Sequence, residues 1–126
     1  MENFHTFLNR YLSNWKAANL DFMENTIDDA FQGIEIREGI TSTHKKEASV
    51  TGWSNAFNYF EDKDMEWILS PISILPLNEN EMMAIIRATM TLEGKLIDTS
   101  NLFFQTFSSK NGEWKLIRTY EETGVY

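Results

Sequence analysis

The spacing of apolar residues predicts a helix at the start of the chain. From Glu2 to Ala18, apolar side chains recur every three or four positions and polar side chains fill most of the others. The apolar members are Phe4, Phe7, Leu8, Tyr11, Leu12, Trp15 and Ala18. Such spacing is typical of an amphipathic helix. Asp21 and Glu24 then stand three residues apart, as in a capping box, and predict a short second helix.

Two more elements are expected before the midpoint of the chain. Residues 30–37 alternate between apolar and polar side chains, which predicts a strand that Gly39 ends. Gly33 within this strand is a candidate for a β-bulge. Residues 40–45 are rich in Thr and Ser, and we expect them to form a loop. Over residues 46–60 the apolar residues return to helical spacing, which predicts a third helix.

The second half of the chain is predicted to be β-structure. Its apolar and β-branched runs are separated by Glu93-Gly94 and Asn111-Gly112, which are dipeptides typical of tight hairpin turns. The predicted strands cover residues 67–77, 82–92, 95–108 and 113–125. Prolines in the first of these strands favour an edge position. Because helices dominate the first half and an antiparallel run of strands follows, the sequence predicts the α+β class.

The two hairpin turns also predict the strand register. Counting outward from two-residue turns gives the residues that face each other across neighbouring strands. The expected pairs are Ala88 with Thr99, Phe103 with Tyr120, and Phe107 with Leu116. One face of the sheet then carries the larger aromatic residues, and we expect the helices to cover it.

Several polar groups share this covered face and predict a pocket. They are Asn101, Gln105, Arg118 and Glu122, with the phenol of Tyr120 between the last two. Burying such groups without partners costs ~1–3 kcal/mol each, so they should pair with one another, with water or with a ligand. Apolar walls suited to a flat ligand would come from Trp15, Trp53, Phe57, Tyr59 and Phe103. Aromatic residues at this spacing more often form plain core.

Each candidate group has a structural alternative. Arg118, Tyr120 and Glu122 could hold an anionic or carbonyl-bearing ligand, or could form a structural ion pair. Asn101 and Gln105 could donate amide hydrogens to a ligand oxygen, or could satisfy backbone groups at a bend in the sheet.

Metal and cofactor chemistry find little support in the motifs. His44 could help to bind an anion at the start of the third helix, but a solvated loop is the favoured interpretation. For Asp28 and Asp29, turn formation is favoured over a role as metal ligands or base. The sequence has no phosphate-binding loop, dinucleotide-binding glycine motif or zinc-ligand spacing, so we expect no metal and no cofactor.

The other face of the sheet predicts a homodimer. It retains Met83, Ile85, Leu102, Phe104 and Ile117, which is too much apolar surface to leave in water. No predicted helix remains to cover it. We expect a second copy of the chain to do so by two-fold symmetry. The outer-face residues expected at this interface are Arg87, Asp98, Phe104 and Glu121.

Composition excludes several partners. The 126 residues include 11 Lys and Arg against 19 Asp and Glu, which gives a formal net charge of −8. This charge argues against nucleic acid and anionic membranes, since both attract positive surfaces. Cysteine is absent, and the N-terminal segment has no signal-peptide pattern. We therefore expect a cytoplasmic protein.

Two segments resemble a known superfamily. The stretch from Trp15 to Phe31 is similar to the two-helix opening and first strand of the nuclear transport factor 2-like superfamily, and Phe104 to Ile117 is similar to its last hairpin. That superfamily includes SnoaL-like polyketide cyclases and ketosteroid isomerases. The resemblance implies one domain over residues 1–126, with three helices in the N-terminal half packed on a curved, mixed, mainly antiparallel sheet that forms a cone. It further implies a pocket between the helices and the concave sheet, and dimerisation through the sheet.

These observations lead to three functional hypotheses. The first is a homodimeric protein that binds a small apolar or carbonyl-bearing molecule without known catalysis. The second is a SnoaL-like isomerase, cyclase or lyase that uses Tyr120 or Glu122 as acid or base. The third is a dimerisation module without a ligand, whose interior would be filled by side chains.

Overall fold

A computed structural model describes residues 2–126 of the protein. Met1, the first residue of the domain expected from the sequence, lies outside the described residues. Within these residues the helices are α1 (Phe4–Lys16), α2 (Leu20–Thr26) and α3 (Lys46–Phe60). The strands are β1 (Ile27–Arg37), β2 (Ile40–Lys45), β3 (Met65–Asn78), β4 (Glu81–Leu92), β5 (Lys95–Leu96), β6 (Ser100–Lys110) and β7 (Glu113–Val125).

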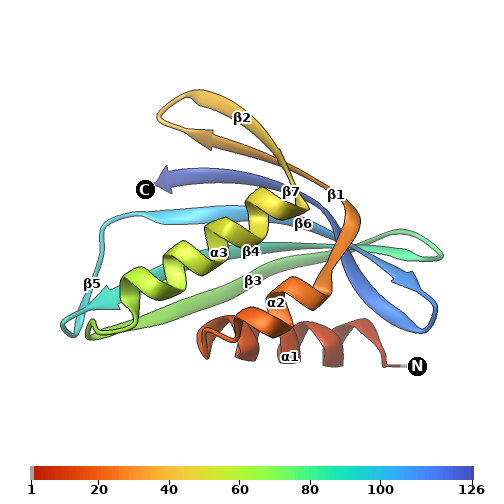
Figure 1. The fold of residues 1–126 in the computed structure, drawn as a ribbon, viewed down its shortest axis with the longest axis horizontal. Helices are drawn as coiled ribbons and strands as arrows, with labels where there is room; N and C mark the ends of the chain where they lie inside the picture. The colour runs from red at the N-terminus through yellow and green to blue at the C-terminus, as the bar shows by residue number, and fades with distance from the viewer. Residues whose placement is uncertain (1) are drawn as a thin grey trace.

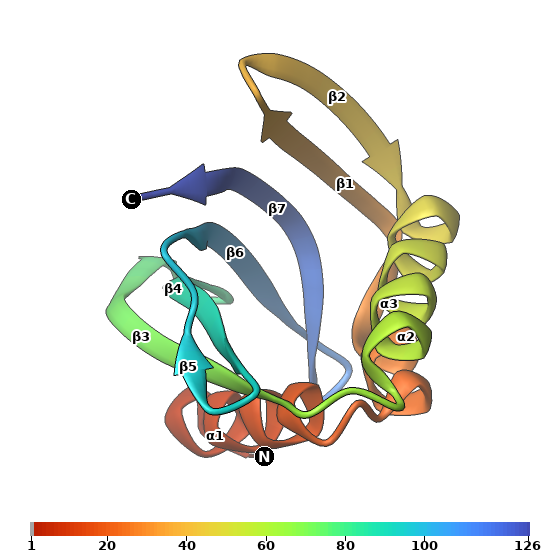
Figure 2. The same ribbon diagram turned by 90° about the vertical axis from the view of Figure 1, so that its left-hand side faces the viewer.

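All the strands belong to one curled, open sheet (Figure 1). Their order is β2–β1–β7–β6–β4–β3, with the short β5 paired to β4. The pairing of β1 with β7 is parallel, and the other neighbouring pairs are antiparallel. Figure 2 shows the sheet curving from β3 round to β2, with α1 below it and α3 along one side. The α+β class and the curved mixed sheet expected from the sequence are confirmed.

The helices begin and end close to the predicted positions. The Asn3 side chain caps α1 by accepting a hydrogen bond from the Thr6 N–H at 2.9 Å. The second helix is capped by Asn19, whose side chain accepts from the Phe22 N–H at 3.2 Å, so the expected capping role of Asp21 is wrong. Among residues 2–126, no helix has both the length and the apolar character needed to cross a bilayer.

Residues 40–45 form strand β2, and the prediction of a loop is wrong. A tight turn at Glu38 and Gly39, with φ angles of 52° and 76°, reverses the chain and pairs β2 with β1. Both central residues of such a turn need positive φ, which glycine adopts without strain. The threonines and Ile40 that looked like a polar loop are good strand formers in this hairpin.

Gly33 is not a bulge, because it pairs regularly with His44 across β1 and β2. The irregularity of β1 lies earlier, between Ile27 and Gln32. Instead, the His44 imidazole occupies the space that a Cβ atom at Gly33 would fill. The glycine therefore allows the imidazole to lie flat against its neighbouring strand.

The register from β4 to β6 is offset by two residues from the predicted one. The turn at Glu93-Gly94 is as expected, but β5 ends at Leu96 and residues 97–99 leave the sheet. When pairing resumes, Ala88 faces Asn101 and not Thr99. Because side chains alternate with a period of two, this even offset leaves the faces of β6 unchanged.

The register from β6 to β7 is offset by one residue, and this exchanges the inward and outward side chains of β7 after Ile117. Phe107 faces Leu116 as predicted, but Thr106 then faces Arg118, so Ile117 is an extra residue in β7. Phe103 consequently faces Glu121, and the predicted pairing with Tyr120 is wrong. An odd offset moves every later side chain to the opposite face. Arg118, Tyr120 and Glu122 therefore lie on the outer face, while Thr119 and Glu121 point inward.

The core lies between α1 and the inner face of the sheet. Phe107 is at its centre, with its ring 5.5 Å from Phe4, 5.3 Å from Phe7 and 5.2 Å from Tyr11. All of these residues are buried. The packing fixes α1 across the sheet so that its last apolar residue, Trp15, packs against Trp53 and Phe103.

Candidate functional site

A cavity of about 410 Å³ lies between α1, α3 and the inner face of the sheet, and we call it the inner cavity. Its aromatic walls are Trp15, Phe31, Trp53, Trp67 and Phe103. Trp15 is central: its rings meet those of Trp53, Phe103 and Trp67 edge-on at centroid distances of 4.8, 5.1 and 6.0 Å. Mutual edge-to-face contacts hold these rings in fixed orientations. The result is a preformed apolar site of a size suited to a small organic molecule.

Two amide side chains from β6 line the inner cavity. Gln105 is 1% exposed, and its Oε1 accepts a hydrogen bond from the Tyr11 hydroxyl at 3.0 Å. Asn101 Oδ1 accepts from the Gly124 N–H at 3.2 Å. Burial raises the pKa of Tyr11 far above its ordinary value, so this phenol remains a neutral donor. Each amide thus has its oxygen engaged by the protein and its NH2 group left as the free end.

Two carboxylic acids lie side by side at the same cavity. Glu35 of β1 faces Glu121 of β7 in the parallel pairing, and both line the cavity. Arg37 pairs with Glu35, with Nε 3.3 Å from Oε1. Burial and, to a smaller extent, the negative charge of Glu35 raise the pKa of Glu121 to about 7, against the opposing positive charge of Arg37. Glu121 can therefore gain or lose a proton close to neutral pH.

The imidazole of His44 completes the polar lining. It lies over Gly33, with its ring centroid 5.7 Å from that of Phe31. The expectation of a solvated loop or an anion site at the start of α3 is wrong, because His44 is a half-buried residue of strand β2 that lines the inner cavity. The signal that could have placed it is the Glu38-Gly39 turn, which makes residues 40–45 a strand.

The structure brings some of the predicted site residues together. Those that line the inner cavity are Trp15, Trp53, Asn101, Phe103 and Gln105. Phe57 is buried beside Trp53, with 5.6 Å between ring centroids, but does not belong to the lining. Tyr59 is 62% exposed and faces away, with the Lys63 ammonium 4.2 Å from its ring centroid. Its expected place in the pocket is wrong.

The predicted polar set of the last strand lies on the outer face. Arg118 pairs with Glu81 at 3.0 Å, and the Tyr120 hydroxyl donates to Glu122 at 2.6 Å. The pairing of Arg118 with Glu122 expected from the sequence is therefore not formed. The inward positions belong to Thr119 and Glu121, which sequence reasoning placed on the other face.

The outer face has a hollow of its own, of about 640 Å³, which we call the outer groove. Its apolar lining includes Ile34, Met83, Phe104 and Tyr120. Arg87 also belongs to this face, and its guanidinium donates to Ser100 Oγ at 2.7 Å. Of the residues expected at a dimer interface here, Glu121 is misplaced because it points inward, and Asp98 lies in the loop between β5 and β6.

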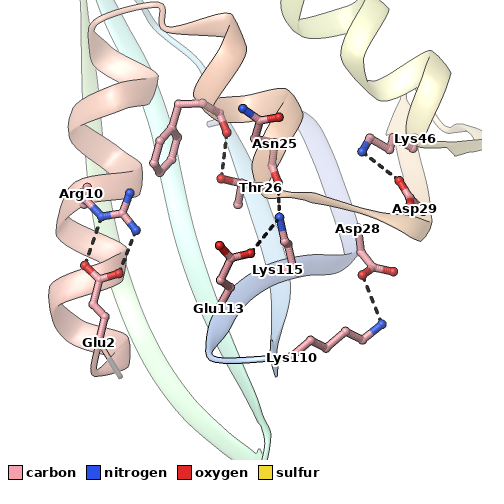
Figure 3. A network of polar contacts seen from close by, with 11 residues as sticks. Glu2, Arg10, Asn25, Thr26, Asp28, Asp29, Lys46, Lys110, Glu113 and Lys115 are labelled. Carbon is pink, nitrogen blue, oxygen red and sulfur yellow. Dashed lines mark hydrogen bonds and ion pairs between the residues drawn. The ribbon is translucent and has the colours of Figure 1, made fainter.

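The acidic pair at the start of β1 joins three elements and lies apart from the inner cavity. Asp28 pairs with Lys110 and Asp29 pairs with Lys46 (Figure 3). The oxygen-to-nitrogen distances are 3.2 and 3.1 Å. Asp28 also accepts from the Ala30 N–H, and this bond together with Lys110 lowers the pKa of its carboxyl group. Within residues 2–126, no group of three or more His, Asp or Glu side chains is arranged to hold a metal ion.

Replacing Glu121 with Gln should stabilise the protein increasingly as the pH rises. The raised pKa means that between pH 4.5 and about 7 the folded state retains a proton that the unfolded state releases, so stability falls across this interval. Gln mimics the protonated acid and avoids this loss, which amounts to about 3 kcal/mol above pH 7.

Urea unfolding at pH 5.5 and pH 8 measures the effect, with Glu122→Gln on the outer face as the matched control. The free energy of unfolding of Glu121→Gln should exceed that of the wild type clearly at pH 8 and much less at pH 5.5. A gain of equal size at both pH values would contradict a shifted titration of Glu121.

Comparison with known proteins identifies the fold. No family model matches the chain, and no curated protein does so. Among solved structures, an NTF2-like protein of unknown function in nutrient uptake from Rhodospirillum rubrum superimposes with a TM-score of 0.70 at 13% identity, over 97% of this chain and 98% of that one. A putative calcium/calmodulin-dependent protein kinase type II association domain from Thiobacillus denitrificans gives a TM-score of 0.75 at 11% identity, over 98% and 96%.

An NTF2-like protein from Cytophaga hutchinsonii gives a TM-score of 0.68 at 13% identity, over 98% of this chain and 99% of that one. At such identities the likeness concerns the fold alone. Three helices on a curled mixed sheet, matched over nearly the whole length of these structures, show that the chain has the nuclear transport factor 2-like (NTF2-like) fold.

Proposed function

We propose that the protein binds a small, largely apolar molecule in the inner cavity. The observation that carries this proposal is the combination of a volume of about 410 Å³ with aromatic walls and a few converging polar groups. Binding sites for small molecules typically have this composition, because apolar walls supply affinity and sparse polar groups fix orientation. Gln105 and Asn101 keep the ligand-binding role expected for them, and Thr119 and Glu121 join them as the inward residues of β7.

The inner cavity also favours binding over a purely structural role. A module whose only output is association would be expected to fill its interior with side chains. Here the side chains of α1, α3 and the sheet instead leave about 410 Å³ unfilled between them. A ligand that occupies the space gives the cavity a function.

Narrowing the inner cavity should weaken binding. Ala56 of α3 lines it, whereas the adjacent Asn55 is exposed. In a titration of naphthalene followed by ligand-observed NMR, Ala56→Leu should lower the affinity about tenfold, because the added side chain occupies ligand space. Asn55→Leu should leave it unchanged. If the wild type binds no naphthalene, or if the two variants bind it equally, the inner cavity is not the binding site.

A second candidate function is acid–base catalysis, and the titration of Glu121 near neutral pH favours it. A general base works best when its pKa lies close to the working pH. Glu121 is therefore a better candidate for the general base than Tyr120 or Glu122, because the Tyr120 hydroxyl is hydrogen-bonded to Glu122 on the outer face. The reaction class that suits a carboxylate beside neutral donors is proton abstraction next to a carbonyl group.

Deuterium exchange into 2-tetralone tests this second function. The wild type should accelerate exchange at the carbon atoms next to the carbonyl in D2O, as followed by proton NMR. Glu121→Gln should lower the acceleration by about 100-fold or more, because general-base catalysis commonly contributes that much. Glu122→Gln is the control and should retain it. Absence of any acceleration by the wild type would remove the catalytic candidate and leave the binding proposal standing.

We further propose that the protein is a homodimer in which a second copy covers the outer face. Support comes from the apolar groove there and from exposed Ile68 and Leu75 on the neighbouring β3. The same face carries both Arg118 and Glu81, so a two-fold partner would offer opposite charges at related positions. A surface of this kind is expected to be an interaction site. Location in the cytoplasm and the single domain over residues 1–126 stay predictions.

Sedimentation equilibrium should detect the dimer and its dependence on Phe104. Introducing a charge with Phe104→Glu should raise the dimer dissociation constant at least about tenfold, because an unpaired carboxylate would be buried at the interface. Tyr59→Glu changes an exposed aromatic residue on α3 and should have no effect. A wild type that is monomeric at high protein concentration would refute the dimer.

A further inference from the structure

The sheet has two end strands, and they differ in how their free edges are protected. Within residues 2–126 these are β2 and β3, and each has one side without a neighbouring strand. Strand β3 contains Pro71 and Pro76, and its pairing with β4 is irregular after each proline. Prolines and bulges are common features that stop an edge strand from pairing with another chain. Strand β2 contains no proline and pairs regularly with β1 along its length.

The free edge of β2, over Ile40–Lys45, is open to solvent, and we call it the β2 edge. Figure 2 shows β2 at the end of the curved sheet, away from α1. The four consecutive residues 40–43 are exposed, and Ile40 is 70% exposed. Isoleucine and threonine favour extended strands. An exposed edge of this composition without a blocking residue is a site where another strand can add.

The hairpin between β1 and β2 determines which backbone groups point outward. In a two-residue hairpin, the residues that flank the turn exchange two hydrogen bonds, and every second residue after them does the same. In β2 these residues are Ile40, Ser42 and His44, which bond to β1. The N–H and C=O groups of Thr41 and Thr43 therefore point away from β1. Together they present two donors and two acceptors at the β2 edge.

A second copy of β2 can satisfy these groups in an antiparallel arrangement with its two-fold axis at Ser42. Thr41 of each copy then faces Thr43 of the other, and each such pair exchanges two hydrogen bonds. An axis at Thr41 or Thr43 would instead require Gly39, which belongs to the turn, or Lys45. Lys45 is the N-cap of α3, so its C=O group accepts within that helix. The register centred on Ser42 is the one that pairs all the outward groups.

The charges at the two ends of β2 fit the same arrangement. Glu38 lies in the turn before β2, Lys45 ends the strand, and both are exposed. Antiparallel pairing brings the Glu38 end of each copy to the Lys45 end of the other, so opposite charges meet twice. Residues 40–46 contain no Asp or Glu, which spares this edge the repulsion expected from a net charge of −8. The exposed Ile40 would face His44 of the other copy.

We propose that two copies of the chain pair their β2 edges through main-chain hydrogen bonds, with the two-fold axis at Ser42. Each copy contributes a strand of six residues, so the interface is smaller than that of a stable complex and the association is weak and reversible. This contact joins strand edges and is separate from the proposed dimer, which covers the outer face. A protein that uses both contacts assembles beyond the dimer.

Single cysteines test the inference, because the chain has no cysteine of its own. Ser42→Cys places one thiol from each copy on the two-fold axis, where opposite Cα atoms lie about 4.5 Å apart, within the range of a disulfide. The background is Phe104→Glu, which weakens the outer-face dimer. Oxidation with copper-phenanthroline should convert most of this variant into a disulfide-linked dimer, as seen on a non-reducing gel.

Ile40→Cys in the same background is the matched control. Its cysteines would lie four positions apart along the paired strands, about 13 Å, which is beyond the reach of a disulfide. It is at least as exposed as Ser42→Cys, so random collisions would link both variants equally. We expect it to form the linked dimer at least about tenfold more slowly than Ser42→Cys.

A second pair of variants tests the main-chain hydrogen bonds. Thr43→Pro, added to Ser42→Cys, removes from each copy an outward N–H group that β1 does not use, and it should slow cross-linking at least about tenfold. Thr43→Val keeps the N–H group and should cross-link at the rate of Ser42→Cys alone. Circular dichroism checks that all variants retain the fold.

Each outcome decides the inference independently of the proposed function. Equal cross-linking rates for Ser42→Cys and Ile40→Cys, or no cross-linking of either, would show that a second copy does not pair with the β2 edge and would overturn the inference. Faster linking through Ile40→Cys would overturn the register centred on Ser42. None of these results changes the expected binding in the inner cavity or the expected dimer at Phe104, which have experiments of their own.

Discussion

One extra residue in the last strand determines which side chains enter the cone. Opposite residues of paired strands share a face, and Ile117 interrupts this correspondence between β6 and β7. Before the bulge in the chain, Leu116 packs in the core. After it, Thr119 and Glu121 take the inward positions. Without the bulge, Arg118 would be forced inward, where a guanidinium is costly to desolvate. The bulge therefore leaves Arg118, Tyr120 and Glu122 on the outer face, where water can solvate them. It also places Glu121 inside, next to Glu35 of β1.

The packing of α1 links this strand geometry to the chemistry of the inner cavity. Phe107, the residue at the bulge on β6, contacts the aromatic row of α1. The same helix carries Tyr11, which orients the Gln105 amide, and Trp15, whose ring forms a wall of the inner cavity. Helix α1 therefore contributes to both the core and the wall of the inner cavity. A change that shifts α1 along the sheet would alter the inner cavity as well as the stability.

The sequence predicts elements well where the signal is local. Residues 46–60 form a helix as expected, since their apolar spacing is sustained over four turns, and Asn101 and Gln105 face inward because the two-residue offset before β6 preserves their side of the sheet. The positions of Arg118, Tyr120 and Glu122 could not be predicted in this way. Ile117 is β-branched and apolar, as strand residues often are, so its residue type does not mark it as the extra residue. Strand β2 was missed for a different reason, because threonine-rich segments suit loops and edge strands equally.

The placement of Glu121 is difficult to explain by stability alone. The chain already carries a net charge of −8, and this acid lies against Glu35, with burial raising its pKa to about 7. A neutral side chain of similar size would avoid both the repulsion and the desolvation. Trp15 and Thr119, two residues that line the same cavity, each keep an occluded side-chain polar atom without a partner, which is costly in the same sense. A raised pKa beside a second acid is more typical of functional sites than of plain core, and Glu121 lines the cavity that we propose as the binding site.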